Sequence, residues 1–301
     1  MSNLRVENCQ FRGDDVSVPL ISGEFHYWRV LKENWRPIAR RIREMGVEVV
    51  ASYVPWNYHE LEPGRYDFTG ETSPQRDLKG FVELLHEEGL WFIARPGPYI
   101  YSEWEFGGVP ERAARHHRMA PEFLAMANDY IRSVCDILVP FQVTKGGPII
   151  LFQADNEPYP PLDSFGSEMG AFDEPGVFKD WLRERYDGDI ARLNAVWRTE
   201  YEDFDRACVY FHEAYVNTER PMADRLFPGE EYRMRYADTK AFIGWYAARI
   251  VDTVAGWLRD AGVEVPVYAN GWSPLFQDFH DLADVSDLSG TDLYPPPFFT
   301  G

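Results

Sequence analysis

The amino-acid sequence predicts an α/β fold, a (β/α)8 TIM barrel of which about six βα units are present in its 301 residues. Apolar runs alternate with amphipathic helical segments along much of the chain, and repeated βα units favour a parallel sheet with right-handed crossovers. Polar residues follow all six predicted strands. A barrel gathers every strand end around one mouth, whereas an open doubly wound sheet concentrates its site at one switch point. The pattern therefore favours the barrel.

The first half of the chain contains four predicted strands, at residues 18–23, 47–54, 91–95 and 149–152. Each of the first three is followed by a helix, the first ending at Gly46 and the second, over 77–88, ending at Gly89. Apolar residues on the first and third helices have helical spacing. They are Trp35, Ile38, Ala39, Ile42 and Met45, then Phe123, Met126, Tyr130, Ile131 and Val134.

The second half is less regular. Segment 158–229 is rich in Pro, Asp, Glu and aromatic residues, and we expect it to be an elaborated loop insertion with short helices near 176–186 and 189–197. A long helix over about 230–260 and strands at 265–270 and 285–294 follow. We therefore expect one barrel domain over 1–301. Residues 295–301 leave no room for two more βα units, so either strands were missed at the amino end or the barrel is carboxyl-terminally incomplete.

Composition excludes several kinds of partner. A formal net charge of −19 argues against nucleic acid and anionic membranes, since both require clustered Lys and Arg. The opening residues lack an apolar signal segment, and no apolar run of 18 residues predicts a membrane span. The expected location is the cytoplasm. Composition leaves open whether the protein forms a homo-oligomer.

Cysteine and histidine usage gives no support for a metal site. Cys9, Cys135 and Cys208 form no CxxC pair, and Cys135 lies on an apolar helical stripe, where burial is expected. The seven His residues contain no HExxH pattern. We predict neither a metal nor another cofactor.

The predicted strand ends carry a mixture of carboxylates, amides and aromatic rings. This mixture suits a sugar, whose hydroxyls take polar contacts while its C–H faces stack on aromatic rings. In chain order the residues are Glu24, His26, Tyr27, Tyr53, Trp56, Asn57, His59, Glu60, Arg95, Tyr99, Tyr101, Glu103, Trp104, Glu105, Asp155, Asn156, Glu157, Asn270, Trp272, Asp292 and Tyr294.

Glu157 is the first candidate for a catalytic acid. The buried run 149–152 leads directly into Asp155, Asn156 and Glu157. Cleavage of a glycoside requires one carboxylic acid to protonate the leaving oxygen and a second carboxylate as nucleophile or base. A solvated Glu at the end of a strand is the alternative interpretation, and the buried run and Asn156 favour the functional one.

Four ordered segments resemble the family 35 glycoside hydrolases, the retaining β-galactosidases. They are SGEFHYWR at 22–29, SYVPWNYHELEPGRYDFTG at 52–70, ARPGPYIYSEWEFGGVP at 94–110 and GGPIILFQADNE at 146–157. Segment 178–204, FKDWLRERYDGDIARLNAVWRTEYEDF, is more similar to family 42 β-galactosidases. Both families belong to one clan of β/α barrels.

The resemblance implies roles for particular residues. Glu157 would be the acid/base, with Asn156 bonded to the 2-hydroxyl of the sugar. Tyr53, Ser102 and Glu103 would line a galactose pocket, and Tyr101 lies in the same loop. Asp155 stands where the family often has Glu and is also expected to bind substrate. Tyr101 and Trp104 could instead simply pack this loop. Glu24 and His26 are expected to be a structural hydrogen-bonded pair at the barrel floor.

Two departures from the family pattern have consequences. Pro158 and Tyr159 replace the Tyr-Gly pair that commonly follows the acid, which predicts a different loop path. The family nucleophile is a Glu at the end of strand seven, so the resemblance places it beyond residue 301. The chain is thus expected to be a carboxyl-terminally truncated catalytic domain, inactive alone.

The expected substrate is a β-galactoside or related oligosaccharide. The alternatives are a galactoside-binding relative without catalysis, and a clan enzyme acting on β-glucosides, β-mannosides or β-glucosaminides.

Overall fold

The computed structural model describes residues 5–7, 10–13, 17–19, 21–162, 164–210, 229–271 and 280–292. The chain divides into two compact units. The first comprises Met1–Glu157, Ile250–Asn270 and Ala283–Gly290, and the second comprises Pro158–Arg249, Gly271–Leu282 and Thr291–Gly301. The predicted single barrel domain with an insertion at 158–229 stays a prediction.

A six-stranded sheet forms the centre of the first unit, in the order β11-β10-β9-β8-β5-β4. Its strands are β4 (Ser22–Glu24), β5 (Val49–Tyr53), β8 (Trp91–Arg95), β9 (Ile149–Gln153), β10 (Val267–Gly271) and β11 (Leu288–Thr291). Neighbouring strands from β4 to β10 pair in parallel. The spatial order follows the chain order, as in a barrel, so the predicted α/β fold with about six barrel strands is confirmed.

The pairing register brings four polar side chains to one end of this sheet. Tyr53 pairs with Arg95 at the end of β5 and β8, and Gln153 pairs with Tyr268 across β9 and β10. β5 and β9 are buried along their whole length, because both of their faces are apolar. The carboxyl ends of the central strands therefore meet around one polar cluster.

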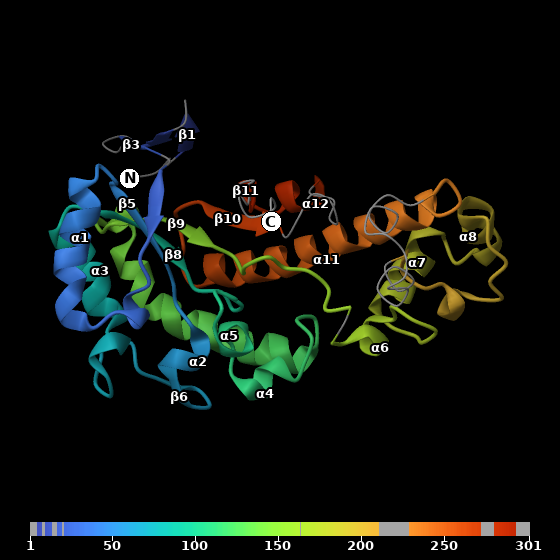
Figure 1. The fold of residues 1–301 in the computed structure, drawn as a ribbon, viewed down its shortest axis with the longest axis horizontal. Coiled ribbons are helices and arrows are strands. Elements are labelled where there is room, and N and C mark those ends of the chain that lie inside the picture. The colour runs from blue at the N-terminus through green and yellow to red at the C-terminus, as the bar shows by residue number, and fades with distance from the viewer. Residues whose placement is uncertain are drawn as a thin grey trace, which may run out of the picture. The chain divides into compact units, whose positions relative to one another are not determined.

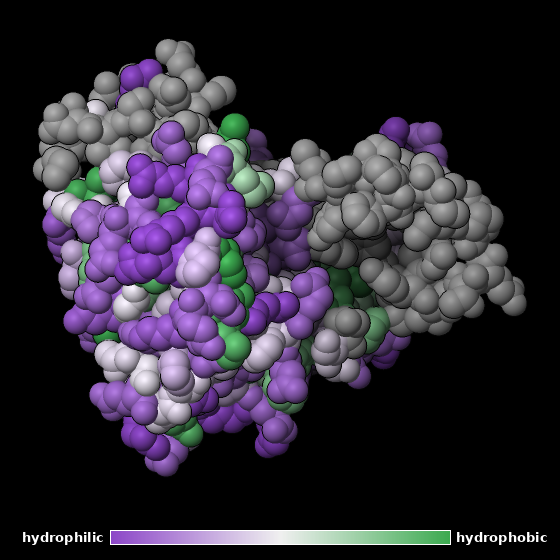
Figure 2. All heavy atoms as spheres, turned by 60° about the vertical axis from the view of Figure 1, so that its left-hand side comes forward, coloured by the Kyte–Doolittle hydropathy of each residue, from purple (hydrophilic) through white to green (hydrophobic). Residues whose placement is uncertain are grey.

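The first unit also contains several helices. They are α1 (Trp35–Glu44), α2 (Trp56–His59), α3 (Leu78–Glu87), α4 (Glu111–Ala114), α5 (Pro121–Leu138) and α12 (His280–Asp284), which spans both units. α3 begins where the Asp77 side chain accepts the N–H of Gly80, and it buries Leu78, Phe81, Val82 and Leu85. α1 and α3 lie beside β5 and β8 (Figure 1). The outer face of this region is largely hydrophilic (Figure 2), as expected for helices with one buried face.

Two details of the sequence-based prediction were wrong, and one was confirmed. The single strand predicted at 18–23 falls on two strands in different sheets, β3 (Ser17–Pro19) and β4. Met45 was expected on the buried face of α1, but it follows the last turn and is 79% exposed. Cys135 is buried on α5, as expected.

The second unit contains α6 (Gly166–Met169), α7 (Val177–Arg185), α8 (Ile190–Trp197) and the first part of α11 (Arg233–Asp260). The buried Asp238 carboxylate joins α11 to α7 and α8. It accepts hydrogen bonds from Tyr186, from Trp197 Nε1 at 2.7 Å and from Arg185 Nε at 2.8 Å. The two short helices predicted within 158–229 are thus confirmed.

Smaller elements complete the described part of the chain. They are strands β1 (Arg5–Glu7), β2 (Gln10–Arg12), β6 (Glu60–Glu62) and β7 (Arg65–Tyr66), and 3₁₀ helices Tyr27–Arg29, Lys32–Asn34, Pro74–Arg76, Glu105–Gly108, Val139–Phe141, Val143–Lys145 and Phe204–Arg206. β1, β2 and β3 form an antiparallel sheet. Among the described helices, none has both the length and the hydropathy needed to span a bilayer.

Candidate functional site

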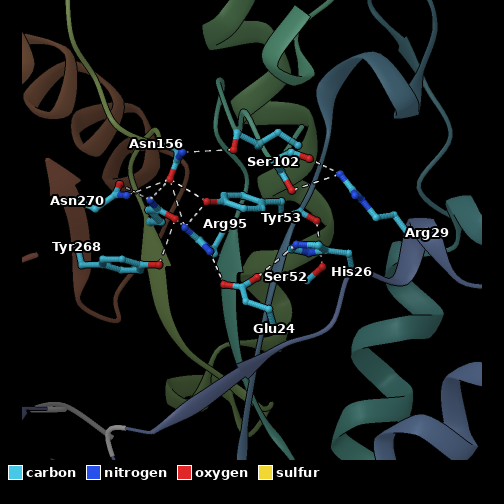
Figure 3. Close-up of polar contacts among 12 residues, drawn as sticks. Glu24, His26, Arg29, Ser52, Tyr53, Arg95, Ser102, Asn156, Tyr268 and Asn270 are labelled. Carbon is cyan, nitrogen blue, oxygen red and sulfur yellow. Dashed lines mark hydrogen bonds and ion pairs between the residues drawn. The ribbon is translucent and has the colours of Figure 1, made fainter. Parts of the chain in front are cut away.

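The side-chain oxygen of Asn156 is the centre of the polar cluster at the strand ends (Figure 3). It accepts hydrogen bonds from four side chains that come from four strands or their ends. The donors are Tyr53 Oη at 2.8 Å, Arg95 Nη2 at 3.2 Å, Gln153 Nε2 at 3.1 Å and Asn270 Nδ2 at 3.1 Å. Asn156 is 5% exposed, and its Nδ2 donates to the Ile100 carbonyl at 3.3 Å. The position of this amide is thus fixed from several sides.

Arg95 and Gln153 extend this network across the sheet. Arg95 donates to Tyr53, to Gln153 and to Glu24, with which it forms an ion pair. Gln153 also accepts from Tyr268 Oη at 3.1 Å and donates to Asn270 Oδ1 at 2.7 Å. Polar atoms of this cluster are therefore paired across neighbouring strands, which is the condition for burying them at low cost.

Glu157 follows Asn156 and is half-buried. Its backbone N–H donates to Asn270 Oδ1 at 3.2 Å, which ties the end of β9 to the end of β10. Asp155 and Glu157 both have left-handed backbone angles, with φ of 59° and 41°. Such angles cost free energy in residues other than glycine and persist only where the surroundings impose them. The chain therefore turns sharply at the acid that the sequence predicts.

The loop after β8 carries three further predicted residues. Tyr101, Ser102 and Glu103 have φ of 49°, 51° and 47°, a run of three left-handed residues. Both Ile100 N and Tyr101 N donate to the carbonyl of Gly107, at 2.9 and 3.2 Å.

Gly107 makes this closure possible. It has φ of 65°, and a Cβ there would lie 2.8 Å from the Tyr99 ring. Arg29 donates to the Ser102 carbonyl and so holds the loop from the side of β4 (Figure 3).

Asp155 is 1% exposed, and its carboxylate contacts Tyr99 and Arg118. Its Oδ1 accepts the N–H of Tyr99 at 2.9 Å, and its Oδ2 lies 3.2 Å from Nε of Arg118. Burial raises the pKa of this carboxyl above its usual value, although the Arg118 charge opposes the rise.

Arg118 is one of three site residues that the sequence did not predict. It lies in the loop between α4 and α5, far from any strand end, and it is 4% exposed. Gln153 and Tyr268 were also missed, although Gln153 could have been found as the one polar residue that interrupts the apolar run before Asp155. No feature of the local sequence marks Arg118.

Several predicted residues lie elsewhere. Glu24 and His26 were expected at the barrel floor, but Glu24 ends β4 at the carboxyl end of the sheet and pairs with Arg95. The Glu24 carboxylate is 3.6 Å from His26 Nε2, and burial lowers the pKa of His26 although Glu24 opposes this. Trp56 and His59 do not line a mouth, because both are fully buried.

Other predicted residues have structural contacts or lie outside the described part of the chain. Trp104 donates to Asn57 Oδ1 at 2.9 Å and packs edge-on against Trp28. Trp272 and Tyr294 lie outside the described residues. Within the residues that the structure describes, no three His, Cys, Asp or Glu side chains are grouped as metal ligands would be.

Comparisons with known proteins concern the family and the fold of this chain. The model of the family described as glycosyl hydrolases family 35 matches residues 10–209. The exo-β-D-glucosaminidase of Pyrococcus horikoshii is 33% identical over 206 residues, which cover 59% of this chain and 26% of that protein. The β-galactosidase of Bos taurus is 36% identical over 153 residues, 49% of this chain and 23% of that protein. The chain spans about a quarter of the length of these curated relatives.

A solved structure extends the likeness to the fold. The β-galactosidase from Rahnella sp. R3 has a TM-score of 0.63 and 17% sequence identity, over 91% of this chain and 39% of that one. At this identity the likeness concerns the fold alone. The family model, in contrast, covers about two thirds of the sequence and includes β5, β8, β9 and the cluster residues Tyr53, Arg95, Gln153 and Asn156. The chain belongs to the glycosyl hydrolases of family 35.

Proposed function

We propose that the protein is a retaining glycoside hydrolase that removes terminal β-D-galactosyl residues, with Glu157 as its acid/base. One observation carries the proposal. Glu157 follows Asn156 at the end of β9, where side chains from β5, β8 and β10 converge on the Asn156 oxygen. A carboxyl group next to a fixed amide at the mouth of a β/α fold is suited to protonate a bound sugar at one oxygen.

The reaction would be a double displacement. Glu157 donates its proton to the glycosidic oxygen as the bond to the anomeric carbon breaks, and a second carboxylate attacks that carbon to form a glycosyl-enzyme. Glu157 then removes a proton from the water that releases the sugar. In retaining enzymes the two carboxyl groups stand about 5 to 5.5 Å apart. Because the chain spans about a quarter of its relatives' length, we propose that the second carboxylate lies outside these 301 residues.

Five residues are proposed to contact the substrate. Asn156 would bond the 2-hydroxyl of the sugar, and Tyr53 would contact the sugar beside it, since its Oη already bonds Asn156. Tyr101, Ser102 and Glu103 would line the pocket from the left-handed turn after β8. Asp155 was also expected to bind substrate. Its buried carboxylate is engaged with Tyr99 and Arg118, so we propose that it supports the turn instead.

A second candidate substrate is a β-glucosaminide. The exo-β-D-glucosaminidase is similar over more of this chain than the Bos taurus β-galactosidase is. The two sugars differ at carbon 2, which Asn156 would face, and at carbon 4. A galactoside-binding protein without catalysis is the third candidate, because it would need the same pocket but no second carboxylate.

A substrate screen on the full-length gene product separates these candidates. Aryl β-galactosides, β-glucosides, β-mannosides and β-glucosaminides are compared by kcat/KM, and NMR of the first product gives its anomeric configuration. We expect the galactoside to be preferred and the product to be the β-anomer. Preference for the glucosaminide would support the second candidate. Galactose binding with no hydrolysis would support the third, and an α-anomeric product would exclude a retaining reaction.

A further inference from the structure

We propose that Arg118 is a positioning residue, which holds the proposed acid Glu157 in place and couples it to the loop that carries Tyr101, Ser102 and Glu103. This inference rests on the proposed function. Arg118 lies in the loop between α4 and α5, outside the strands of the sheet.

Three contacts of Arg118 fall on consecutive residues at the end of β9. Its Nε lies 3.2 Å from Oδ2 of Asp155, Nη2 is 3.3 Å from the Asn156 carbonyl oxygen, and Nη1 is 3.4 Å from the Glu157 carbonyl oxygen. All three acceptors belong to the turn that presents the acid. One guanidinium thus contacts the whole turn.

A fourth contact joins this turn to the neighbouring loop. Arg118 Nη2 donates to Tyr101 Oη at 2.9 Å. The guanidinium carbon also lies 4.3 Å from the centroid of the Tyr99 ring and 5.4 Å from that of Tyr101. Because Tyr101 begins the left-handed run that continues through Ser102 and Glu103, Arg118 connects the proposed sugar-binding loop with the proposed acid.

The chemistry of this position favours arginine. A guanidinium has five N–H donors in a planar fork, so it bonds several acceptors and stacks on an aromatic face at once, whereas the ammonium of lysine is a compact point charge. A buried cation also requires an opposite charge, and Asp155 supplies it.

Backbone angles explain why a positioning residue is needed. Asp155 and Glu157 have φ of 59° and 41°, and such conformations persist only when surrounding contacts hold them. Arg118 bonds to the carbonyls of Asn156 and Glu157, which belong to the two peptide groups on either side of Glu157. Without these bonds fewer contacts hold the turn at these backbone angles, and the carboxyl of Glu157 moves from its position.

The first test compares leaving groups in the full-length gene product. A phenyl β-galactoside needs a proton from the acid when it is cleaved, whereas a 2,4-dinitrophenyl β-galactoside does not, and kcat/KM reports the step that forms the glycosyl-enzyme. For Arg118→Lys we expect kcat/KM for the phenyl substrate to fall on the order of a hundredfold, the effect of a misplacement of about 1 Å. The dinitrophenyl substrate needs the sugar-binding loop but not the acid, so its kcat/KM should fall much less. An equal loss for both substrates, or no loss, would overturn the proposal.

Arg259→Lys is the matched control. Arg259 also donates to two backbone carbonyls, those of Val263 and Val265, and pairs with a carboxylate, that of Asp287, at the other end of β10. We expect this variant to lose stability without a leaving-group effect. If Arg118→Lys does not fold, Asp155→Asn replaces it, because it removes the charge that orients Arg118 and should give the same leaving-group pattern.

A second readout needs no activity, so it separates this inference from the proposed function. Hydrogen exchange of the Glu157 amide, which donates to Asn270, reports how firmly the turn is held. We expect faster exchange in Arg118→Lys than in the wild type or Arg259→Lys. If the wild type hydrolyses no glycoside but this exchange rises, the proposed function fails and the positioning role stands. Unchanged exchange at Glu157 would contradict the positioning role.

Discussion

The backbone N–H of Glu157 donates to the side-chain oxygen of Asn270 at 3.2 Å. The same Asn270 side chain donates through Nδ2 to Oδ1 of Asn156 at 3.1 Å. One amide on β10 therefore positions both members of the Asn-Glu pair at the end of β9, although Asn270 is 113 and 114 positions from these two residues in the sequence. This arrangement makes Asn270 part of the proposed site without requiring it to touch the sugar.

Replacing Asn270 should reduce both stability and activity. In Asn270→Ala the N–H of Glu157 and the amide of Gln153 lose an acceptor, and a buried polar group left unpaired costs about 1–3 kcal/mol. We expect a loss of unfolding free energy in this range and a lower kcat/KM. Asn194→Ala is the control, since Asn194 binds the backbone of Tyr201 in the second unit. Equal activity losses in both variants would show that Asn270 has no special relation to the site.

His59 makes stability depend on pH. Its Nδ1 is 2.6 Å from the Asp67 carbonyl oxygen, which only accepts, so Nδ1 carries the proton and Nε2 accepts from Tyr27 Oη at 2.6 Å. This neutral ring is fully buried, and burial lowers its pKa to about 4. In the unfolded chain the pKa of His59 is near its ordinary value of 6.5. Between pH 4 and pH 6.5 unfolded His59 is therefore protonated, whereas folded His59 is not. Stability is therefore full above pH 6.5 and falls as the pH drops towards 4.

The size of this effect is measurable. From pH 7.5 to pH 5 the wild type should lose about 2 kcal/mol of unfolding free energy through His59. The unfolding free energy of His59→Gln, measured in urea at both pH values, should not show this decrease. His86→Gln, on the exposed face of α3, should show the same decrease as the wild type. Identical pH dependence in the wild type and His59→Gln would contradict the buried neutral ring.

The edges of the sheet predict association of the 301-residue chain when it is produced alone. β4 and β11 are the edge strands of the six-stranded sheet, and Ser289, Gly290 and Thr291 of β11 are exposed. Exposed edge strands pair with other chains, and a lysine on the edge opposes this. We expect oligomers in light scattering after size exclusion, and fewer of them in Ser289→Lys than in Ala125→Lys, which adds the same charge on an exposed part of α5. A monomeric wild-type chain would contradict this expectation.

Most of the fold could be predicted from the sequence because its signals are local. Buried apolar runs mark β5, β8 and β9, and helical spacing with terminal glycines marks α1 and α3. The first strand was placed wrongly, since nothing in residues 18–23 shows that Pro19 and Ser22 belong to different sheets. Which strands pair depends on contacts between distant residues.

The candidate site could be predicted only in part for the same reason. Asn156, Tyr53 and Asn270 were expected near one another because all three follow strands, and the hydrogen bonds at Asn156 join them. Arg118 reaches the site from a helix-connecting loop, and its contacts span 17 to 39 positions along the chain. The engagement of Asp155 with Arg118 was equally invisible, because burial of a carboxylate beside a distant cation leaves no local pattern.

The most direct test of the central assignment is the kinetics of Glu157→Gln in the full-length gene product, with Glu122→Gln on the exposed first turn of α5 as the control. If Glu157 is the acid/base, kcat/KM for a phenyl β-galactoside falls by about 10² to 10⁴, while kcat/KM for the 2,4-dinitrophenyl substrate changes little. The kcat for the dinitrophenyl substrate nevertheless falls, because the glycosyl-enzyme no longer has a base to activate water. Wild-type kcat/KM for the phenyl substrate in Glu157→Gln would contradict the account.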